Sequence, residues 1–350
     1  MLSKYASNVI SAKVRAMYGG RVSTRDYNNL IACRTVSDVA VYLKNHTHYH
    51  DELANVNELG INRNQLENLI RKKLFHDLES LCRYEISTGS SLTEYTIVRT
   101  EIEQIIHSLM YLAGGNAYGY IYSLPMFFNK RTKINLMGLV SVKNYDEFLG
   151  VLKGSAYELM LAKHRPEEGQ DLDLSAIEKT LYDYLYGKFF DAIRKNTPKK
   201  VRAELSETLS AYIDYSNFVR IVRLKRNGSK VKSAVLNYGT IKDRYISQMY
   251  NAENEEQVFS IMEHTNRGKK IKNYKYNYVD ELPDRVLYNK CRSNIRFSMH
   301  PAVIMFSYIF LLQIEIQNLT TIIEGVRYEV NKSELENLLI LKAQKREDVV

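Results

Sequence analysis

The sequence predicts an all-α protein made of three quasi-equivalent helical domains. Three observations lead to this fold class: helix-breaking residues are scarce, apolar residues recur at helical spacing, and one layout of segments occurs three times. The 350 residues include only 16 Gly and 5 Pro, a composition that favours long helices with short connections. A chain of this length also exceeds one simple core, which suggests two or three units.

Long amphipathic helices are predicted at three places. In the stretch 66–82, apolar residues fall on one helical stripe. The stretches 174–193 and 282–297 show the same period, and Pro283 stands in a first turn, where proline is tolerated. A second apolar helix follows each of them, at a spacing that suits two antiparallel helices joined by a short turn.

An acid–amide motif marks each of these second helices, in EIEQIIHSLMYLAGG, DYSNFVRIVRLKRNG and EIQNLTTIIEGVR. Residues at i and i+3 share a helix face, so each carboxylate lies beside an amide at the edge of an apolar stripe. An unpaired amide buried there would cost roughly 1–3 kcal/mol. We therefore expect the motif to clamp the backbone of the next unit's short helices, in preference to a ligand-binding role. Its residues are Glu101 and Gln104, Asp214 and Asn217, and Glu315 and Asn318.

A pair of shorter helices is predicted upstream of each long pair. The stretch 26–53 resembles 133–161, since both run from a Leu-rich helix through a break into a second helix, then to Leu-Lys and a Tyr. The stretch 243–265 is a weaker third copy. This repeat is longer than the usual solenoid period, so three domains are favoured over a continuous array. The predicted units are residues 1–115, 116–228 and 229–350.

Bulk properties indicate the environment. The three cysteines are scattered and form no CxxC pair, which fits a reduced, cytosolic protein. No apolar run typical of a signal peptide opens the chain, and the apolar tract that begins at Pro301 is too short and too polar for a bilayer span. We expect a buried helix there. The net charge of +9 suits an acidic protein, lipid headgroups or nucleic acid, or a merely soluble surface.

The sequence predicts no catalytic, cofactor or metal residues. HTHYHDE (46–52) is rich in metal-ligand types, but we interpret it as a solvent-facing helix end. No GxxxxGK[ST] or GxGxxG motif occurs, and the Gly-rich stretch 112–123 is interpreted as a link between units. The basic stretches 225–232 and 266–279 contain tyrosines and are interpreted as solvated turns, with single-stranded RNA binding as the alternative.

Three segments together resemble a known family. They are YASNVISAKVRAMYGGRVSTRDYNNLIACRTVSDVAVYLKNHTHY near the N-terminus, DYSNFVRIVRLKRNG in the middle, and EIQNLTTIIEGVRYEVNKSELENLL near the C-terminus. They resemble the C subunit of bacterial and archaeal V-type (A/V-type) ATPases, whose eukaryotic equivalent is the d subunit. The likeness covers nearly the whole chain and includes the threefold layout.

The resemblance implies a funnel-shaped, pseudo-threefold, non-catalytic adaptor of the rotor. In that family the protein is a monomer within a hetero-oligomeric complex, on the cytoplasmic face of the membrane. Its concave side receives the central-shaft subunits, and its other side rests on the proteolipid ring. ATP hydrolysis or synthesis is thereby linked to transport of H⁺ or Na⁺. No cofactor, nucleic acid or transmembrane segment of its own is implied.

The repeats are not identical at their basic ends. Gln104 replaces Asn in the first copy, and Thr321 and Glu324 stand where the second copy has Arg220 and Arg223. If exposed, the basic residues of the second copy are candidates for contacts with a partner. These residues are Arg220, Arg223 and Lys225. The alternative function is a free-standing helical scaffold or an RNA-binding protein that uses the basic, tyrosine-containing loops.

Overall fold

The all-α prediction is confirmed. A computed structural model describes residues 4–83, 86–115, 120–121, 124–167, 170–226, 235–271, 274 and 276–341. Helix makes up 76% of the structure, and the described residues include no strand.

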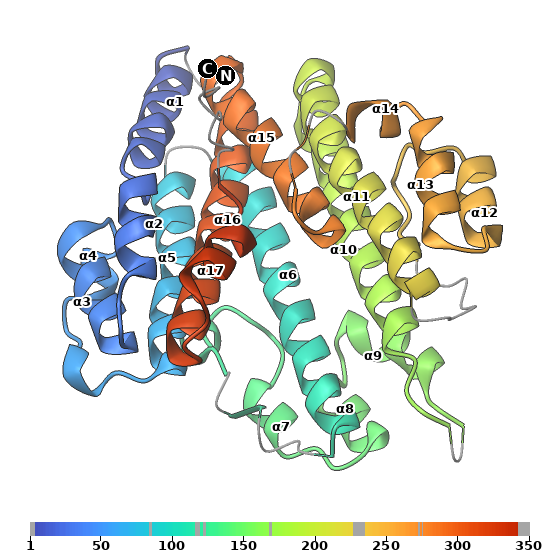
Figure 1. Ribbon diagram of the computed structural model, residues 1–350, viewed down its shortest axis with the longest axis horizontal. Helices are drawn as coiled ribbons and strands as arrows, with labels where there is room; N and C mark the ends of the chain where they lie inside the picture. Colours follow the sequence, from blue (N-terminus) through green and yellow to red (C-terminus); the bar gives the residue numbers. More distant parts are fainter. Residues whose placement is uncertain are drawn as a thin grey trace.

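Three helical hairpins form the body of the molecule (Figure 1). The predicted helices at 66–82, 174–193 and 282–297 are confirmed, each within the first helix of a hairpin. Only two or three residues separate the two helices of a hairpin, which makes the partners antiparallel. The hairpins are α5 (Arg63–Cys82) with α6 (Ile86–Ala113), α10 (Leu174–Asn196) with α11 (Lys199–Arg226), and α15 (Leu282–Phe297) with α16 (Pro301–Arg327).

The six long helices contact one another in a closed cycle. Besides the contacts within each hairpin, α6 packs against α10, α11 packs against α15, and α16 packs against α5. The second helix of each hairpin therefore meets the first helix of the next hairpin, and the last hairpin meets the first. Residues far apart in the chain are held side by side by this arrangement.

Short helices precede each hairpin, as predicted, but they come in threes where we expected pairs. The third helix of each set is short, and N-caps such as Ser23, Thr35, Asn144 and Asn254 begin several of the others. The sets are α2 (Thr24–Ile31), α3 (Val36–His46) and α4 (His50–Leu53); α7 (Leu136–Val140), α8 (Tyr145–Val151) and α9 (Ala156–Leu161); and α12 (Asp243–Asn251), α13 (Glu255–Glu263) and α14 (Gly268–Ile271).

The remaining described elements lie outside the three hairpins and the three sets of short helices. Helix α1 (Lys4–Gly19) packs against α16, and α17 (Lys332–Leu338) packs against α16 and α2. Short 3₁₀ turns lie at η1 (Glu58–Gly60), η3 (Met126–Phe128), η4 (Ala162–His164) and η6 (Val279–Glu281). Helices α1 and α17 therefore both meet the helix that closes the cycle.

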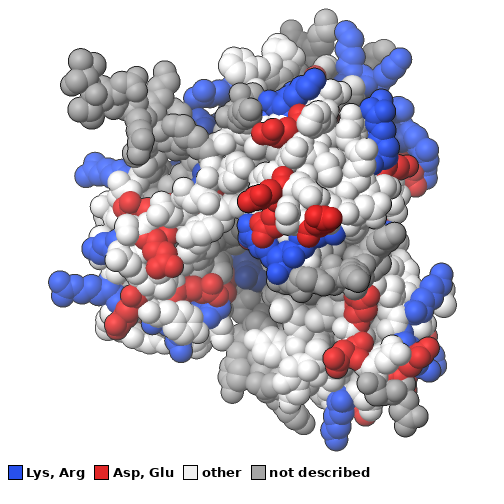
Figure 2. All heavy atoms as spheres, turned by 45° about the vertical axis from the view of Figure 1, so that its right-hand side comes forward, with Lys and Arg blue, Asp and Glu red and all other residues white. Residues whose placement is uncertain are grey.

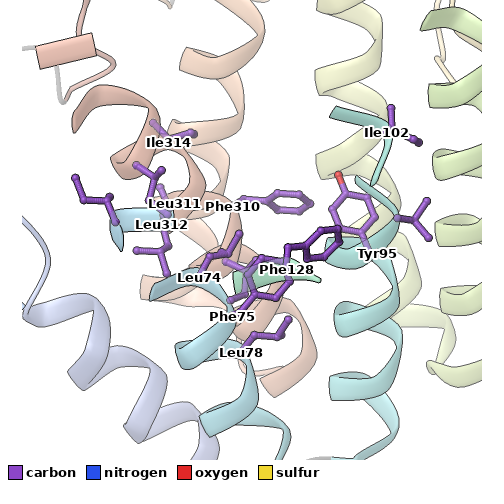
Figure 3. Packing of buried hydrophobic residues seen from close by; sticks show 14 of the residues in the cluster. Leu74, Phe75, Leu78, Tyr95, Ile102, Phe128, Phe310, Leu311, Leu312 and Ile314 are labelled. Atoms are coloured by element: carbon purple, nitrogen blue, oxygen red, sulfur yellow. The ribbon is translucent and has the colours of Figure 1, made fainter. Parts of the chain in front are cut away.

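The main core lies where α5, α6 and α16 meet (Figure 3). Tyr95 of α6 lies edge-on to Phe310 of α16 with ring centroids 5.7 Å apart, and Phe75 of α5 contacts Phe128 at 5.5 Å. A second cluster lies beneath α12 and α13, against α11 and α15. Aromatic contacts of this kind add to the burial of apolar area.

The apolar tract that begins at Pro301 forms the first half of α16 and is buried, as expected. In the part of the chain that the structure describes, α16 is the one helix long and apolar enough to cross a membrane, by length and composition. Other helices bury 83% of its most apolar window. A core helix accounts for this composition.

The stretch 46–52 corrects one prediction in part. We expected a solvent-facing helix end, and His46, His50 and Asp51 are exposed. Tyr49, however, is fully buried and Glu52 is 8% exposed, so these two side chains face the interior, on the side where α3 packs against α16. In contrast, half of the stretch 112–123 and most of the stretch 225–232 lie outside the described residues, and so do the interpretations that fall on them.

Candidate functional site: three acid clamps and a polar cavity

The carboxylate of Glu315 joins the last hairpin to the first set of short helices. Its Oε2 accepts a hydrogen bond from the backbone N–H of Val22 at 3.0 Å, just before α2. Its Oε1 accepts from the hydroxyl of Tyr49 at 3.0 Å and lies 2.6 Å from His48 Nε2, just before α4. One buried side chain thus holds both ends of a three-helix set.

Glu101 makes the corresponding contacts with the second set. It accepts from the hydroxyl of Thr132 at 2.6 Å, ahead of α7, and from the hydroxyl of Tyr157 at 2.7 Å, within α9. Burial raises the pKa of Tyr157, as does the adjacent Glu101 carboxylate. The phenol therefore remains a hydrogen-bond donor at neutral pH.

Asp214 holds the third set and has the most partners. Its Oδ1 accepts from the backbone N–H groups of Thr240 and Ile241 at 2.6 and 3.0 Å, ahead of α12. Its Oδ2 accepts from the Thr240 hydroxyl at 2.6 Å and from Arg267 Nε at 2.8 Å, just before α14. Arg267 also donates to both carboxylate oxygens of Glu207, at 2.7 and 3.0 Å.

The same contact pattern therefore occurs three times. In each case the acid accepts a hydrogen bond from the segment that precedes the first short helix of a set. It accepts another from a residue at the start of the third short helix of the same set. Glu315, the acid of the last hairpin, binds the first set of short helices. The donors at the third short helix were not predicted: they are Tyr49, Tyr157 and Arg267.

A signal for two of these donors was present in the sequence. Tyr49 and Tyr157 are the tyrosines that follow Leu-Lys in the two similar stretches. Arg267 breaks the pattern, and it also corrects our interpretation of 266–279 as a solvated turn, because Arg267 is only 7% exposed. A guanidinium supplies several donors in one plane, which suits two carboxylates at once.

Two of the motif amides, those of Asn217 and Asn318, each form two hydrogen bonds with a single backbone residue, one with its carbonyl and one with its N–H. Asn217 Nδ2 donates to the carbonyl of Leu236 at 2.9 Å, and its Oδ1 accepts from the N–H of Leu236 at 2.8 Å. Asn318 does the same with Ile340, at 3.0 and 2.8 Å. Leu236 lies ahead of the third set of short helices, whereas Ile340 follows α17 at the C-terminal end.

In the first copy, Gln104 accepts a hydrogen bond from the hydroxyl of Tyr120 at 2.9 Å. Both residues are buried, at 1% and 0% exposure. The segment that follows α6 is thus also tied to the amide of its motif.

Two glycines make room for the third clamp. A Cβ at Gly239 would lie 2.6 Å from Asp214 Oδ1, and one at Gly268 would lie 1.8 Å from the carbonyl oxygen of Met262. Any other residue would collide with the Asp214 carboxylate at the first position and with the backbone of Met262 at the second. These positions therefore require glycine because of a close approach, not because of a turn.

The three basic candidate residues are placed differently from one another. Arg220 is half-buried and pairs with Glu178, and Lys225 is half-buried and donates to the carbonyl of Tyr250 at 2.6 Å. Arg223 is the exposed one, with 59% of its side chain accessible. Its Nε lies 2.6 Å from Asp280 Oδ1.

Arg220 and Arg223 line a polar cavity of about 210 Å³ among α10, α11 and α15. Tyr182, Tyr186 and Tyr212 also line it, and burial raises the pKa of each phenol. Burial likewise raises the pKa of Asp284 on its α15 side. The walls come from the start of α10, the end of α11 and the start of α15, so the cavity lies away from the hairpin turns.

The cavity wall offers neutral phenols and arginine–carboxylate pairs, which suit polar protein–protein contacts. Among the residues that the structure describes, no group of three or more His, Cys, Asp or Glu side chains could hold a metal ion.

Comparison with known proteins identifies the family. Residues 10–338 match the ATP synthase (C/AC39) subunit family. The chain belongs to this family.

Two curated relatives agree with the family match at low identity. The C subunit of the A-type ATP synthase from Pyrococcus furiosus is 22% identical over 240 residues, which are 65% of this chain and 62% of the relative. The match therefore spans less than two thirds of that relative's length. The protein of the same name from Pyrococcus abyssi is 21% identical over 268 residues, 75% of this chain and 69% of the relative.

Proposed function

We propose that this member of the C/AC39 family is the non-catalytic rotor adaptor of a rotary ATPase. It joins the central shaft to the membrane proteolipid ring at the cytoplasmic face, as a monomer within the complex, and thereby links ATP hydrolysis or synthesis to transport of H⁺ or Na⁺. Family membership supports the complex. The closed cycle of hairpins, each joined by its acid to a set of short helices, supports the adaptor role.

An adaptor that passes torque must not deform. A chain of three units joined only in sequence order would have a free first and last unit and would bend between them. Here Glu315 joins the last hairpin to the first set of short helices, so no unit has a free edge. The hydrogen-bonded carboxylates of the three clamps, together with close packing, then make the assembly stiff. We interpret residues 1–115, 116–228 and 229–350 as three pseudo-threefold units of a funnel on this basis.

We assign the polar cavity beside α11 to the shaft side. Arg223 is exposed on its wall, and its neighbours include neutral phenols and the paired carboxylates Glu178 and Asp280. A partner that docks there gains hydrogen bonds to phenols and to arginine–carboxylate pairs. The assignment predicts that Arg223 contributes to shaft binding in a salt-dependent way.

The test is a reconstituted complex that contains either Arg223→Glu or Arg226→Glu. Arg226 is a matched control, because it is on the same helix, is 46% exposed, pairs with Glu255 and lies outside the cavity. We expect Arg223→Glu to lower the affinity for isolated shaft subunits and the number of ions moved per ATP, with an unchanged melting temperature. Equal behaviour of the two variants would contradict the shaft assignment.

A second measurement tests the adaptor role itself. A complex that lacks this chain should hydrolyse ATP without moving ions, and addition of the wild-type protein should restore transport. Transport that proceeds without the chain would refute the role.

A further inference from the structure

The turns of the second and third hairpins form one continuous end of the molecule, at the top of Figure 1. Hydrogen bonds join this end to its neighbours: Asn196 Nδ2 donates to Ser91 Oγ at 3.0 Å, and Ser298 Oγ donates to Glu204 Oε2 at 2.8 Å. We call this end the hairpin-turn surface. It consists of Arg194, Lys195, Lys199, Lys200, Arg296, Phe297 and Met299.

The charged members of the hairpin-turn surface are all basic: Arg194, Lys195, Lys199, Lys200 and Arg296. Arg194 pairs with Asp191 at 2.8 Å. Lys195, Lys199 and Lys200 are exposed, and no carboxylate of the described residues forms an ion pair with them. Figure 2 shows Lys and Arg side chains projecting from this upper end of the molecule.

These lysines do not serve the helix on which they lie. Lys199 and Lys200 lie in the first turn of α11, and this turn contains no acidic residue. The helix dipole disfavours cations at the N-terminal end of a helix. Their placement has a local cost and no partner within the described chain. A negatively charged partner outside the protein would offset that cost.

Two large apolar side chains project beside these charges. Phe297 is 77% exposed and Met299 is 85% exposed. The turn that bears them is held firmly, because Arg15 donates to the carbonyl oxygens of Ile295 and Ser298, both at 2.9 Å. The exposure is therefore built into an ordered turn, and a partner is expected to cover it.

We propose that the hairpin-turn surface docks on anionic lipid headgroups, with Phe297 and Met299 inserted at the headgroup level. Clustered lysines bind the negative surface, and the apolar side chains enter the headgroup boundary. The proposal rests on the proposed function only for orientation. It makes the hairpin turns the membrane-facing end, and the polar cavity lies away from them.

The test is co-sedimentation of the whole protein with phosphatidylcholine vesicles, with and without phosphatidylglycerol. We expect binding only to the phosphatidylglycerol vesicles, and weaker binding as salt rises. The triple variant Lys195→Gln, Lys199→Gln, Lys200→Gln should bind roughly 100-fold more weakly, because each lysine near an anionic surface contributes about fivefold. The variant Phe297→Ser, Met299→Ser should also bind more weakly, with an unchanged melting temperature.

The matched control is a second triple variant that removes three lysine charges from the opposite end of the molecule. Lys130, Lys133 and Lys143 are exposed around α7, at the bottom of Figure 1, and their replacement by Gln should leave vesicle binding within about twofold of wild type. Equal losses in both triple variants would overturn the proposal. So would hairpin-turn variants that keep vesicle affinity but lose binding to soluble ATPase subunits, since the partner would then be a protein. Neither outcome alters the test with Arg223→Glu.

Discussion

Asn217 bonds both backbone polar groups of Leu236, and Asn318 repeats this geometry with Ile340. Each asparagine is 3% exposed, so water cannot replace these bonds. The amide acts as a backbone-like partner for a segment that belongs to no sheet or helix. Its loss would leave an N–H and a C=O unpaired in the interior.

Replacement of Asn217 or Asn318 by Leu is therefore expected to destabilise the protein. The isostere keeps the volume but leaves backbone groups unpaired, which costs about 1–3 kcal/mol. The measurement is a denaturant or thermal melting curve for each variant. Asn251→Leu is the control, since Asn251 is exposed at the end of α12; it should change stability by less than about 0.5 kcal/mol. Unchanged melting of the two buried variants would show that the motif is not a structural clamp.

Glu315→Gln should loosen the closure between the last hairpin and the first short helices. Val22 and Tyr49 donate to different oxygens of this carboxylate. The NH₂ of a glutamine cannot accept a hydrogen bond, so one of these two bonds is lost. We expect faster hydrogen exchange at the Val22 amide, while exchange at Thr240 and Ile241 is unchanged. Asp214→Asn should give the opposite pattern, because Asp214 bonds Thr240 and Ile241. A Val22 amide that stays fully protected in Glu315→Gln would argue against this closure.

Arg267→Lys should be markedly destabilising although the charge is kept. Arg267 reaches Asp214 and both oxygens of Glu207, and a lysine ammonium cannot reproduce that planar fork. We expect a loss of about 2–3 kcal/mol in unfolding free energy. Arg223→Lys is the control, because its single partner, Asp280, lies at the surface. Equal losses of unfolding free energy in both variants would show that the planar hydrogen bonds of the Arg267 guanidinium do not stabilise the protein.

The sequence predicted the long helices well because apolar stripes along them are long enough to show a period. The third helix of each short set was missed, since helices such as His50–Leu53 and Gly268–Ile271 have too few residues to show one. The buried position of Asn217 and Asn318, one turn beyond the acids Asp214 and Glu315, also followed from local spacing.

The partners of these acids could not be derived in the same way. Periodicity gives the order of units along the chain but not whether the last unit meets the first, so the bonds from Glu315 to Val22 and Tyr49 were not predicted. Arg267 was assigned to the surface because its neighbours in sequence are basic. Its burial follows from two carboxylates, Asp214 and Glu207, contributed by another helix.

Acid should weaken the third clamp within a defined pH window. Hydrogen bonds from Arg267 lower the pKa of Glu207 from 4.5 to about 2, although partial burial alone would raise it. Because the folded-state pKa is the lower one, the stabilisation is complete above pH 4.5 and is lost as the pH falls toward 2. The side chain is 45% exposed, so solvent screening reduces the contribution to about 1 kcal/mol. Thermal melting of wild type and Glu207→Gln as a function of pH is the measurement. The wild type should be more stable by a constant margin above pH 4.5, and the margin should shrink between pH 4.5 and 2. A margin that is independent of pH would show that the charge of Glu207 does not stabilise the clamp.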